Sequence, residues 1–213
     1  EIFQNIVSNQ PNMMLWLGDI TYLREADFYS KKAILNRNTH SRSLPELQEL
    51  LVSCNHYAIW DDHDFGVNDG GADFPQREAS EQEFMRFWDV PSQSPIRTRT
   101  GVYDAKIFGP EGQRVQVIML DTRYFRSPLK KSEKRVGGPY VSDDSPTKTM
   151  LGEAQWTWLK QELEKPAEVR LIGTSIQLLP EARGQEAWGN LPREREKFIR
   201  LVKETQAGGV VLL

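Results

Sequence analysis

Five short apolar runs are spaced along the chain, and polar or turn-forming residues bound each of them. Near-continuous apolar character over a few residues is typical of strands that are buried on both faces of a sheet. The pattern therefore predicts strands at residues 13–17, 57–60, 115–120, 169–173 and 210–213.

Helical periodicity fills the stretches between these runs. The chain opens within a helix at EIFQNIV, and apolar residues recur on one face at residues 43–51, 80–88, 152–163 and 190–202. Ser43 is the expected N-cap of the helix at 43–51. Ser80 and Glu83 form an expected capping box at the start of the helix at 80–88.

Strands that alternate with helices predict an α/β protein in which helices cover sheet layers. No repeat or linker divides the sequence, and 213 residues are enough for one sizeable core. We therefore expect a single domain over residues 1–213. The Gly-, Pro- and Asp-rich stretches 64–80 and 126–150 are expected to be binding or lid loops.

Composition and charge exclude several classes of protein. A net charge of −3 and a pI near 5.7 give no electrostatic reason to expect binding to nucleic acid or to an anionic membrane. No apolar stretch approaches the roughly 18 residues that a membrane-spanning helix needs. Cys54 is the single cysteine, so an internal disulfide is impossible.

Three of the predicted strands end at acidic residues. Asp19 follows the first strand, the sequence D-D-H-D at residues 61–64 follows the second, and Asp121 follows the third. Ligands of open α/β sheets bind beyond the carboxyl ends of the strands, so we expect these acidic groups to converge there. For Asp121 alone, a turn-forming or helix-capping role is the competing interpretation.

Converging carboxylates repel one another unless some of them take up protons or cations lie among them. His63, which is flanked by Asp62 and Asp64, favours the cations. A histidine among carboxylates is either a ligand of a borderline metal or a general acid whose charged form the acids stabilise. The sequence therefore predicts a metal centre at this edge of the sheet.

The segments LGDITY, WDDHDFGVNDGG, SPIRTRTGVYDAKIFGPEG, LDTRYFR and LGEAQWTWL resemble successive blocks of the alkaline phosphatase D family. These PhoD-like metallophosphatases are a branch of the calcineurin-like fold. The resemblance covers nearly the whole chain. It implies a four-layer αββα sandwich with a two-metal centre that hydrolyses phosphate esters.

The resemblance also implies roles for individual residues. Asp19, in the G-D block, would bridge two metal ions, and Tyr22 matches the tyrosine of the family's G-D-N-x-Y block. Asp62 stands where the wider superfamily has the asparagine ligand of G-N-H-[D/E]. His63 stands at the catalytic histidine of that motif. Asp64 stands at the acid that follows it and is expected to be catalytic too.

The chain departs from the family pattern in two respects. Ile20 replaces the asparagine of G-D-N-x-Y. The family's first metal-binding block and its last blocks, of the S-G-D-x-H type, have no counterpart in the sequence. We therefore expect a domain truncated at both ends, with weak or absent phosphatase activity and at most one tightly bound metal ion.

Four further residues are candidates for the substrate site. Arg123 is a candidate phosphate-binding fork, and a structural salt bridge is the competing interpretation. Asp121 could bind metal or, as we prefer, orient a neighbouring group. Asn68 is a candidate ligand within a loop whose simpler explanation is a polar turn. Glu186, in QEAWGN, resembles another family block and is expected to line the substrate pocket.

Two functions from different classes follow. The first is a phosphomonoesterase or phosphodiesterase in which two cations, of iron, calcium, zinc or manganese, clamp the phosphate ester. The second is a non-catalytic module that retains some carboxylates and one cation. A partner chain is expected to cover exposed sheet edges. The family is associated with export, which suggests a periplasmic or extracellular location.

Overall fold

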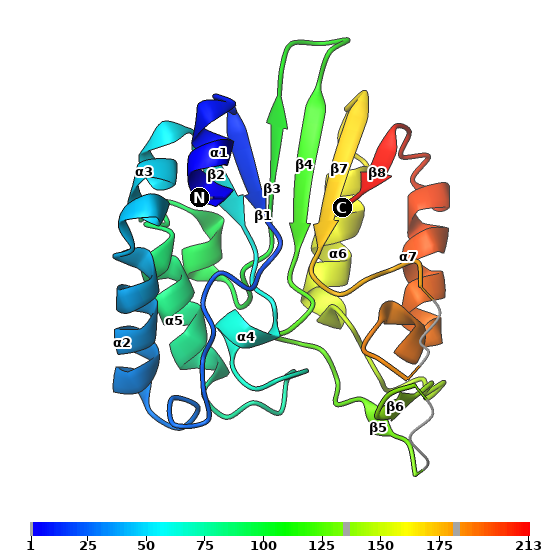
Figure 1. The fold of residues 1–213 in the computed structure, drawn as a ribbon. Coiled ribbons are helices and arrows are strands. Elements are labelled where there is room, and N and C mark those ends of the chain that lie inside the picture. Colours follow the sequence, from blue (N-terminus) through cyan, green and yellow to red (C-terminus); the bar gives the residue numbers. More distant parts are fainter. Residues whose placement is uncertain (1, 134–136, 181–183) are drawn as a thin grey trace. The chain divides into compact units, whose positions relative to one another are not determined.

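The computed structural model describes residues 2–133, 137–180 and 184–213. They group into two compact units, shown in Figure 1. The N-terminal unit comprises Glu1–Gly70 with Phe74–Val102, and the C-terminal unit comprises Gly71–Asp73 with Tyr103–Leu213. The single domain predicted for residues 1–213 remains a prediction.

The N-terminal unit is built on two parallel strands. β1 (Met13–Trp16) pairs with β2 (Asn55–Ala58) in a register that places Met13 opposite Asn55 and Trp16 opposite Ala58. The helices of this unit are α1 (Ile2–Ser8), α2 (Lys31–Arg42), α3 (Pro45–Ser53), α4 (Asp62–Phe65) and α5 (Arg77–Phe87), followed by a 3-10 turn at Pro95–Thr98. Because the two strands run parallel, their carboxyl ends lie at the same edge.

Buried aromatic and leucine side chains hold the N-terminal unit together. Trp16, Leu47, Leu50 and Phe87 are almost completely buried in one cluster, which joins β1, α3 and α5. His56 continues this cluster: its Nδ1 accepts a hydrogen bond from the Trp16 indole at 2.9 Å, and its Nε2 lies 3.1 Å from the Leu50 carbonyl oxygen. This geometry requires the neutral imidazole with its proton on Nε2.

The C-terminal unit contains a four-stranded sheet in the order β3-β4-β7-β8. β3 (Asp104–Phe108) is antiparallel to β4 (Val115–Leu120), whereas β4, β7 (Val169–Thr174) and β8 (Val210–Leu212) are parallel. Helix α6 (Gly152–Leu163) connects β4 to β7, and α7 (Pro192–Glu204) connects β7 to β8, after a 3-10 turn at Trp188–Asn190. Two-residue strands β5 (Lys130–Lys131) and β6 (Tyr140–Val141) form a small separate pair.

A buried carboxylate ties α7 to the start of α6. One oxygen of Glu194, Oε2, accepts hydrogen bonds from the Thr149 hydroxyl at 2.8 Å, the Met150 N–H at 2.6 Å and the Trp156 indole at 2.9 Å. Glu194 is only 7% exposed, so these donors have little access to water. The sheet and both helices share one core that includes Ile118, Trp156, Ile172, Trp188 and Phe198.

The α/β class predicted from the sequence is confirmed, and so are most of the predicted elements. The strand predicted at 57–60 begins earlier, at Asn55. Helix α2 and strand β3 have no counterpart in the prediction. None of the described helices is long and apolar enough to cross a bilayer.

Two predicted helix caps are wrong. Ser43 closes α2 rather than opening α3, and its hydroxyl donates to the His40 carbonyl. Helix α5 begins at Arg77, so Ser80 lies inside it and its N–H donates to the Gln76 carbonyl. Both errors have the same cause. The helical turn before each serine is polar, so the sequence does not show that a helix already precedes the serine.

Candidate metal centre

A left-handed turn follows β1 and carries the first acidic residue. Gly18 has φ +110° and Asp19 has φ +60°. A Cβ at Gly18 would lie 2.3 Å from the backbone nitrogen of Asp61 and 2.4 Å from its Cβ. Only glycine permits both this backbone conformation and the close approach of the two segments. The glycine before Asp19 therefore brings this turn against the segment that follows β2.

The second acidic segment begins after β2 and forms the short helix α4. Asp61 is its N-cap residue, and Asp62 and His63 occupy its first turn. The Phe65 side chain is completely buried and anchors the helix, while Asp62 is 7% exposed. The His63 carbonyl accepts a hydrogen bond from the Leu23 N–H at 3.0 Å, which links α4 to the chain after Asp19.

The two segments bring three potential ligands together. Asp19, Asp62 and His63 each offer one ligand atom, and these atoms all lie within 4.8 Å of one another. Nε2 of His63 lies 4.0 Å from Oδ1 of Asp62. Atoms with this spacing can share one cation at ordinary coordination distances of about 2.0–2.6 Å.

Tyr22 lies beside this group. Its hydroxyl donates to Oδ2 of Asp19 at 3.2 Å, and its ring stacks on His63 with centroids 4.5 Å apart. Asp19 is the main cause of a raised Tyr22 pKa, with smaller contributions from burial, from the hydrogen bond and from Asp64 and Asp62. A bound cation would reverse this effect, because it stabilises the phenolate.

The hydrogen bonding of the carboxylates fits a cation. Among the described residues, Oδ1 of Asp19 is buried without a hydrogen-bond partner. Oδ2 of Asp62 accepts the Asp69 N–H at 2.7 Å, which fixes the orientation of this carboxylate. A buried carboxylate oxygen without a donor is costly, and a metal ion would supply the missing positive charge.

The Asp64 carboxylate has a different environment from those of its neighbours. Both of its oxygens accept backbone N–H groups: Oδ2 from Asp19 at 2.5 Å and from Asp61 at 3.2 Å, and Oδ1 from Thr21 at 2.6 Å. Removal from water raises the pKa of Asp64 to about 7, although these hydrogen bonds partly offset the effect. The Asp64 carboxylate therefore lies against the backbone N–H groups of Asp19, Thr21 and Asp61.

Asn68, the remaining candidate in the N-terminal unit, is exposed and does not belong to the three-residue group. Gly18 and the Asp69 N–H, by contrast, support the site. The glycine immediately before Asp19 is the signal by which the sequence could have revealed the first of these. The second depends on a turn that the sequence pattern does not specify.

The candidates of the C-terminal unit are engaged within that unit. Oδ1 of Asp121 accepts the N–H groups of Arg123 at 2.9 Å and Tyr124 at 3.0 Å, as in a turn-forming aspartate. The guanidinium of Arg123 is buried and donates two hydrogen bonds to Glu186, at 2.8 Å and 2.6 Å. Arg126 lies 3.3 Å from the same carboxylate.

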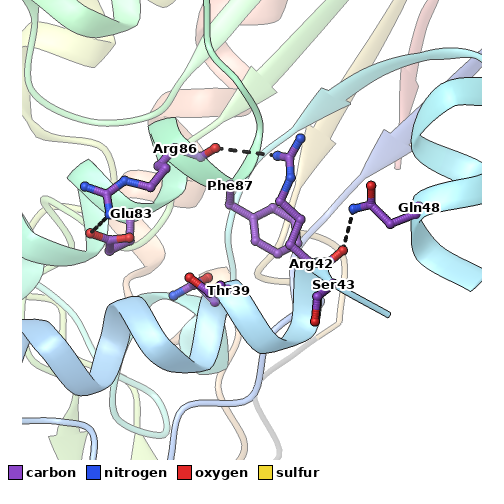
Figure 2. Close-up of a pocket in the computed structure, with 8 residues that line it drawn as sticks. Thr39, Arg42, Ser43, Gln48, Glu83, Arg86 and Phe87 are labelled. Carbon is purple, nitrogen blue, oxygen red and sulfur yellow. Dashed lines mark hydrogen bonds and ion pairs between the residues drawn. The ribbon is translucent and has the colours of Figure 1, made fainter. Parts of the chain in front are cut away.

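A separate cavity in the N-terminal unit lies among α2, α3 and α5 and has a volume of about 420 Å³ (Figure 2). Its arginines are already paired: Arg42 contacts Asp89 and lies 5.9 Å over the Phe87 ring, and Arg86 lies 3.5 Å from Glu83. No predicted site residue lies among its lining residues, which are Asn38, Thr39, Arg42, Ser43, Gln48, Glu83, Arg86 and Phe87.

The fold and the site together define an α/β protein with a candidate metal centre at the carboxyl ends of two parallel strands. The family model described as PhoD-like phosphatase matches residues 1–213. The chain belongs to the PhoD-like phosphatase family, as the resemblance of its sequence motifs predicts.

A solved structure described as "Structure of PhoD" has a similar fold, with a TM-score of 0.74 and 19% sequence identity. The alignment covers 99% of this chain and 46% of that chain, so the present chain spans about half the length of its structural relative. No curated protein matches the sequence. The similarity in fold agrees with the α/β class predicted from the sequence.

Proposed function

We propose that the protein is a metal-dependent phosphoric ester hydrolase, a phosphomonoesterase or phosphodiesterase, with a dinuclear metal centre. The observation that carries this proposal is the convergence of Asp19, Asp62 and His63 within 4.8 Å, in a chain of the PhoD-like phosphatase family. The substrate class is a phosphate ester.

Each side chain has its own proposed role at the site. Asp19 and Asp62 would hold the metal ions through carboxylate oxygens, and Tyr22 would add a phenolic oxygen. When bound, the ions neutralise charge on the phosphate oxygens and lower the pKa of a water molecule. Iron, calcium, zinc and manganese all accept these oxygen ligands.

His63 is the proposed proton donor to the leaving alkoxide. Its side chain is 30% exposed, so a substrate could reach it, and its Nε2 lies 4.0 Å from Oδ1 of Asp62. Arg123 is the proposed phosphate-binding residue, oriented by Glu186. Asp121 is proposed to shape the turn that carries Arg123, and Asn68 is proposed to contact the substrate from the surface.

The alternative function is a non-catalytic module that binds one metal ion. The observation that favours it is that Asp19, Asp62 and His63 offer three ligand atoms within 4.8 Å of one another, a spacing that suits one ion. In that case the purified chain would hold at most one ion and would not hydrolyse phosphate esters.

One experiment separates the two functions. The chain is loaded with iron, calcium, zinc or manganese, and its metal content and its hydrolysis of p-nitrophenyl phosphate and bis(p-nitrophenyl) phosphate are measured. We expect His63→Ala to lower turnover by about 100-fold or more and to leave metal content nearly unchanged. Asp19→Asn should lower both.

His40→Ala is the matched control, because His40 is an exposed histidine on α2. It should change neither measurement. If the chain hydrolyses neither ester with any of the four metals and binds at most one ion, the result supports the binding module and contradicts the enzyme. Equal loss of metal and turnover in His63→Ala would make His63 a ligand instead.

A further inference from the structure

The Asp64 side chain joins two chain segments that are far apart in the sequence. Its carboxylate accepts hydrogen bonds from Asp19 and Thr21 after β1, and from Asp61 at the start of α4. Each oxygen is therefore occupied by at least one backbone donor. The side chain therefore connects the turn after β1 to the start of α4 through its hydrogen bonds.

The Asp19 turn needs such support because its backbone is strained. A left-handed conformation is uncommon for aspartate and less favourable than for glycine, and Asp19 has φ +60°. Hydrogen bonds from N–H groups to an ionised carboxylate are stronger than those between neutral groups. The Asp64 contacts to Asp19 and Thr21 therefore stabilise the turn.

We propose that Asp64 is a positioning residue that fixes the Asp19 carboxylate beside Asp62 and His63 before any metal ion binds. The resemblance to the family places Asp64 among the catalytic residues. Its hydrogen bonds to backbone N–H groups instead assign it a structural role at the site. The consequence for metal affinity rests on the proposed function. The hydrogen bonding itself does not.

The first test uses the unmodified chain after treatment with a chelator. If Asp64 holds the turn, the backbone amides of Asp19 and Thr21 should resonate downfield and exchange slowly with solvent, as amides bonded to a carboxylate do. Exchange at the rate of an exposed loop would overturn the proposal. This test requires neither metal binding nor activity.

The second test compares Asp64→Asn with a matched control. Asp27 is a buried aspartate of the N-terminal unit, and its Oδ2 also accepts two hydrogen bonds, from the Arg24 N–H at 3.0 Å and the Arg37 Nε–H at 2.9 Å. Asp27→Asn should perturb stability without changing metal affinity. In Asp64→Asn the Asp19 and Thr21 amides should shift upfield, and the Kd for Mn²⁺ should rise about 10–100-fold.

Turnover of p-nitrophenyl phosphate completes the test. Loss of a positioning residue should be largely recovered at saturating Mn²⁺, whereas loss of a proton-transferring group would persist at every concentration. Persistent loss with unchanged Mn²⁺ affinity would overturn the proposal. If the unmodified chain binds no Mn²⁺, the proposed function fails, and the amide measurements still decide the role of Asp64. They also decide it if Asp64→Asn does not fold.

Discussion

Replacing Gly18 with alanine should damage both the fold and the proposed metal centre. The first contribution is backbone strain, since alanine at φ +110° costs roughly 1 kcal/mol more than glycine. The second is steric. The new Cβ would lie 2.3 Å from the Asp61 nitrogen, whereas ordinary contacts begin near 3.4 Å, so the segments must separate by about 1.1 Å (3.4 minus 2.3).

Overpacking of this kind costs about 1–3 kcal/mol. The two contributions together predict that Gly18→Ala lowers the free energy of unfolding by about 2–4 kcal/mol. Because the separation moves Asp19 away from Asp62 and His63, metal affinity should fall as well. Urea unfolding followed by tryptophan fluorescence measures the first effect, and Mn²⁺ titration measures the second.

Gly112→Ala is the matched control for strain. Gly112 has φ +83°, and a Cβ there would meet nothing within 4 Å. It should lower the free energy of unfolding by about 1 kcal/mol and leave Mn²⁺ affinity unchanged. If Gly18→Ala and Gly112→Ala cost the same, the close approach to Asp61 does not constrain the site and the reasoning is refuted.

Two further predictions concern stability. Glu194→Ala should lower the free energy of unfolding by about 3 kcal/mol, roughly 1 kcal/mol for each of the three donors that lose their acceptor. Glu196→Ala, at an exposed position of the same helix, should lower it by less than about 0.5 kcal/mol in the same urea titration. Burial lowers the pKa of His56, outweighing hydrogen bonds to the Leu50 and Leu51 backbone. The unfolded chain therefore binds its proton more readily, and stability should fall as pH drops below about 6.5. The melting temperature of His56→Gln should depend less on pH between 7.5 and 5.5, and an unchanged slope would contradict this assignment.

The sequence predicts the buried strands well and the partly exposed elements poorly. The residues of β4 are almost all buried, so the strand is continuously apolar. β3 has no residue that is fully buried, and its sequence DAKIF carries no comparable run. Helix α2 buries only Ile34 and Asn38, so its apolar stripe is too sparse to recognise.

The sequence likewise predicts one part of the candidate site and not another. That Asp19 and the acidic residues after β2 would meet follows from the parallel pairing of two apolar strands. The role of Asp64 could not be predicted, because it depends on contacts between residues 45 positions apart and on the left-handed backbone at Gly18 and Asp19. A motif specifies which acids are present, and the folded backbone decides which oxygens remain available.

The left-handed conformation of Asp19 also restricts how the proposed metal centre could be redesigned. Asp69, whose N–H orients Asp62, is left-handed too, with φ +51°. Among non-glycine residues, aspartate, asparagine and histidine adopt this conformation more often than the others. Exchanging Asp19 for a cysteine or glutamate ligand would therefore strain the backbone as well as change the coordination chemistry, so engineering of softer or longer ligands is better directed at Asp62, on regular helix.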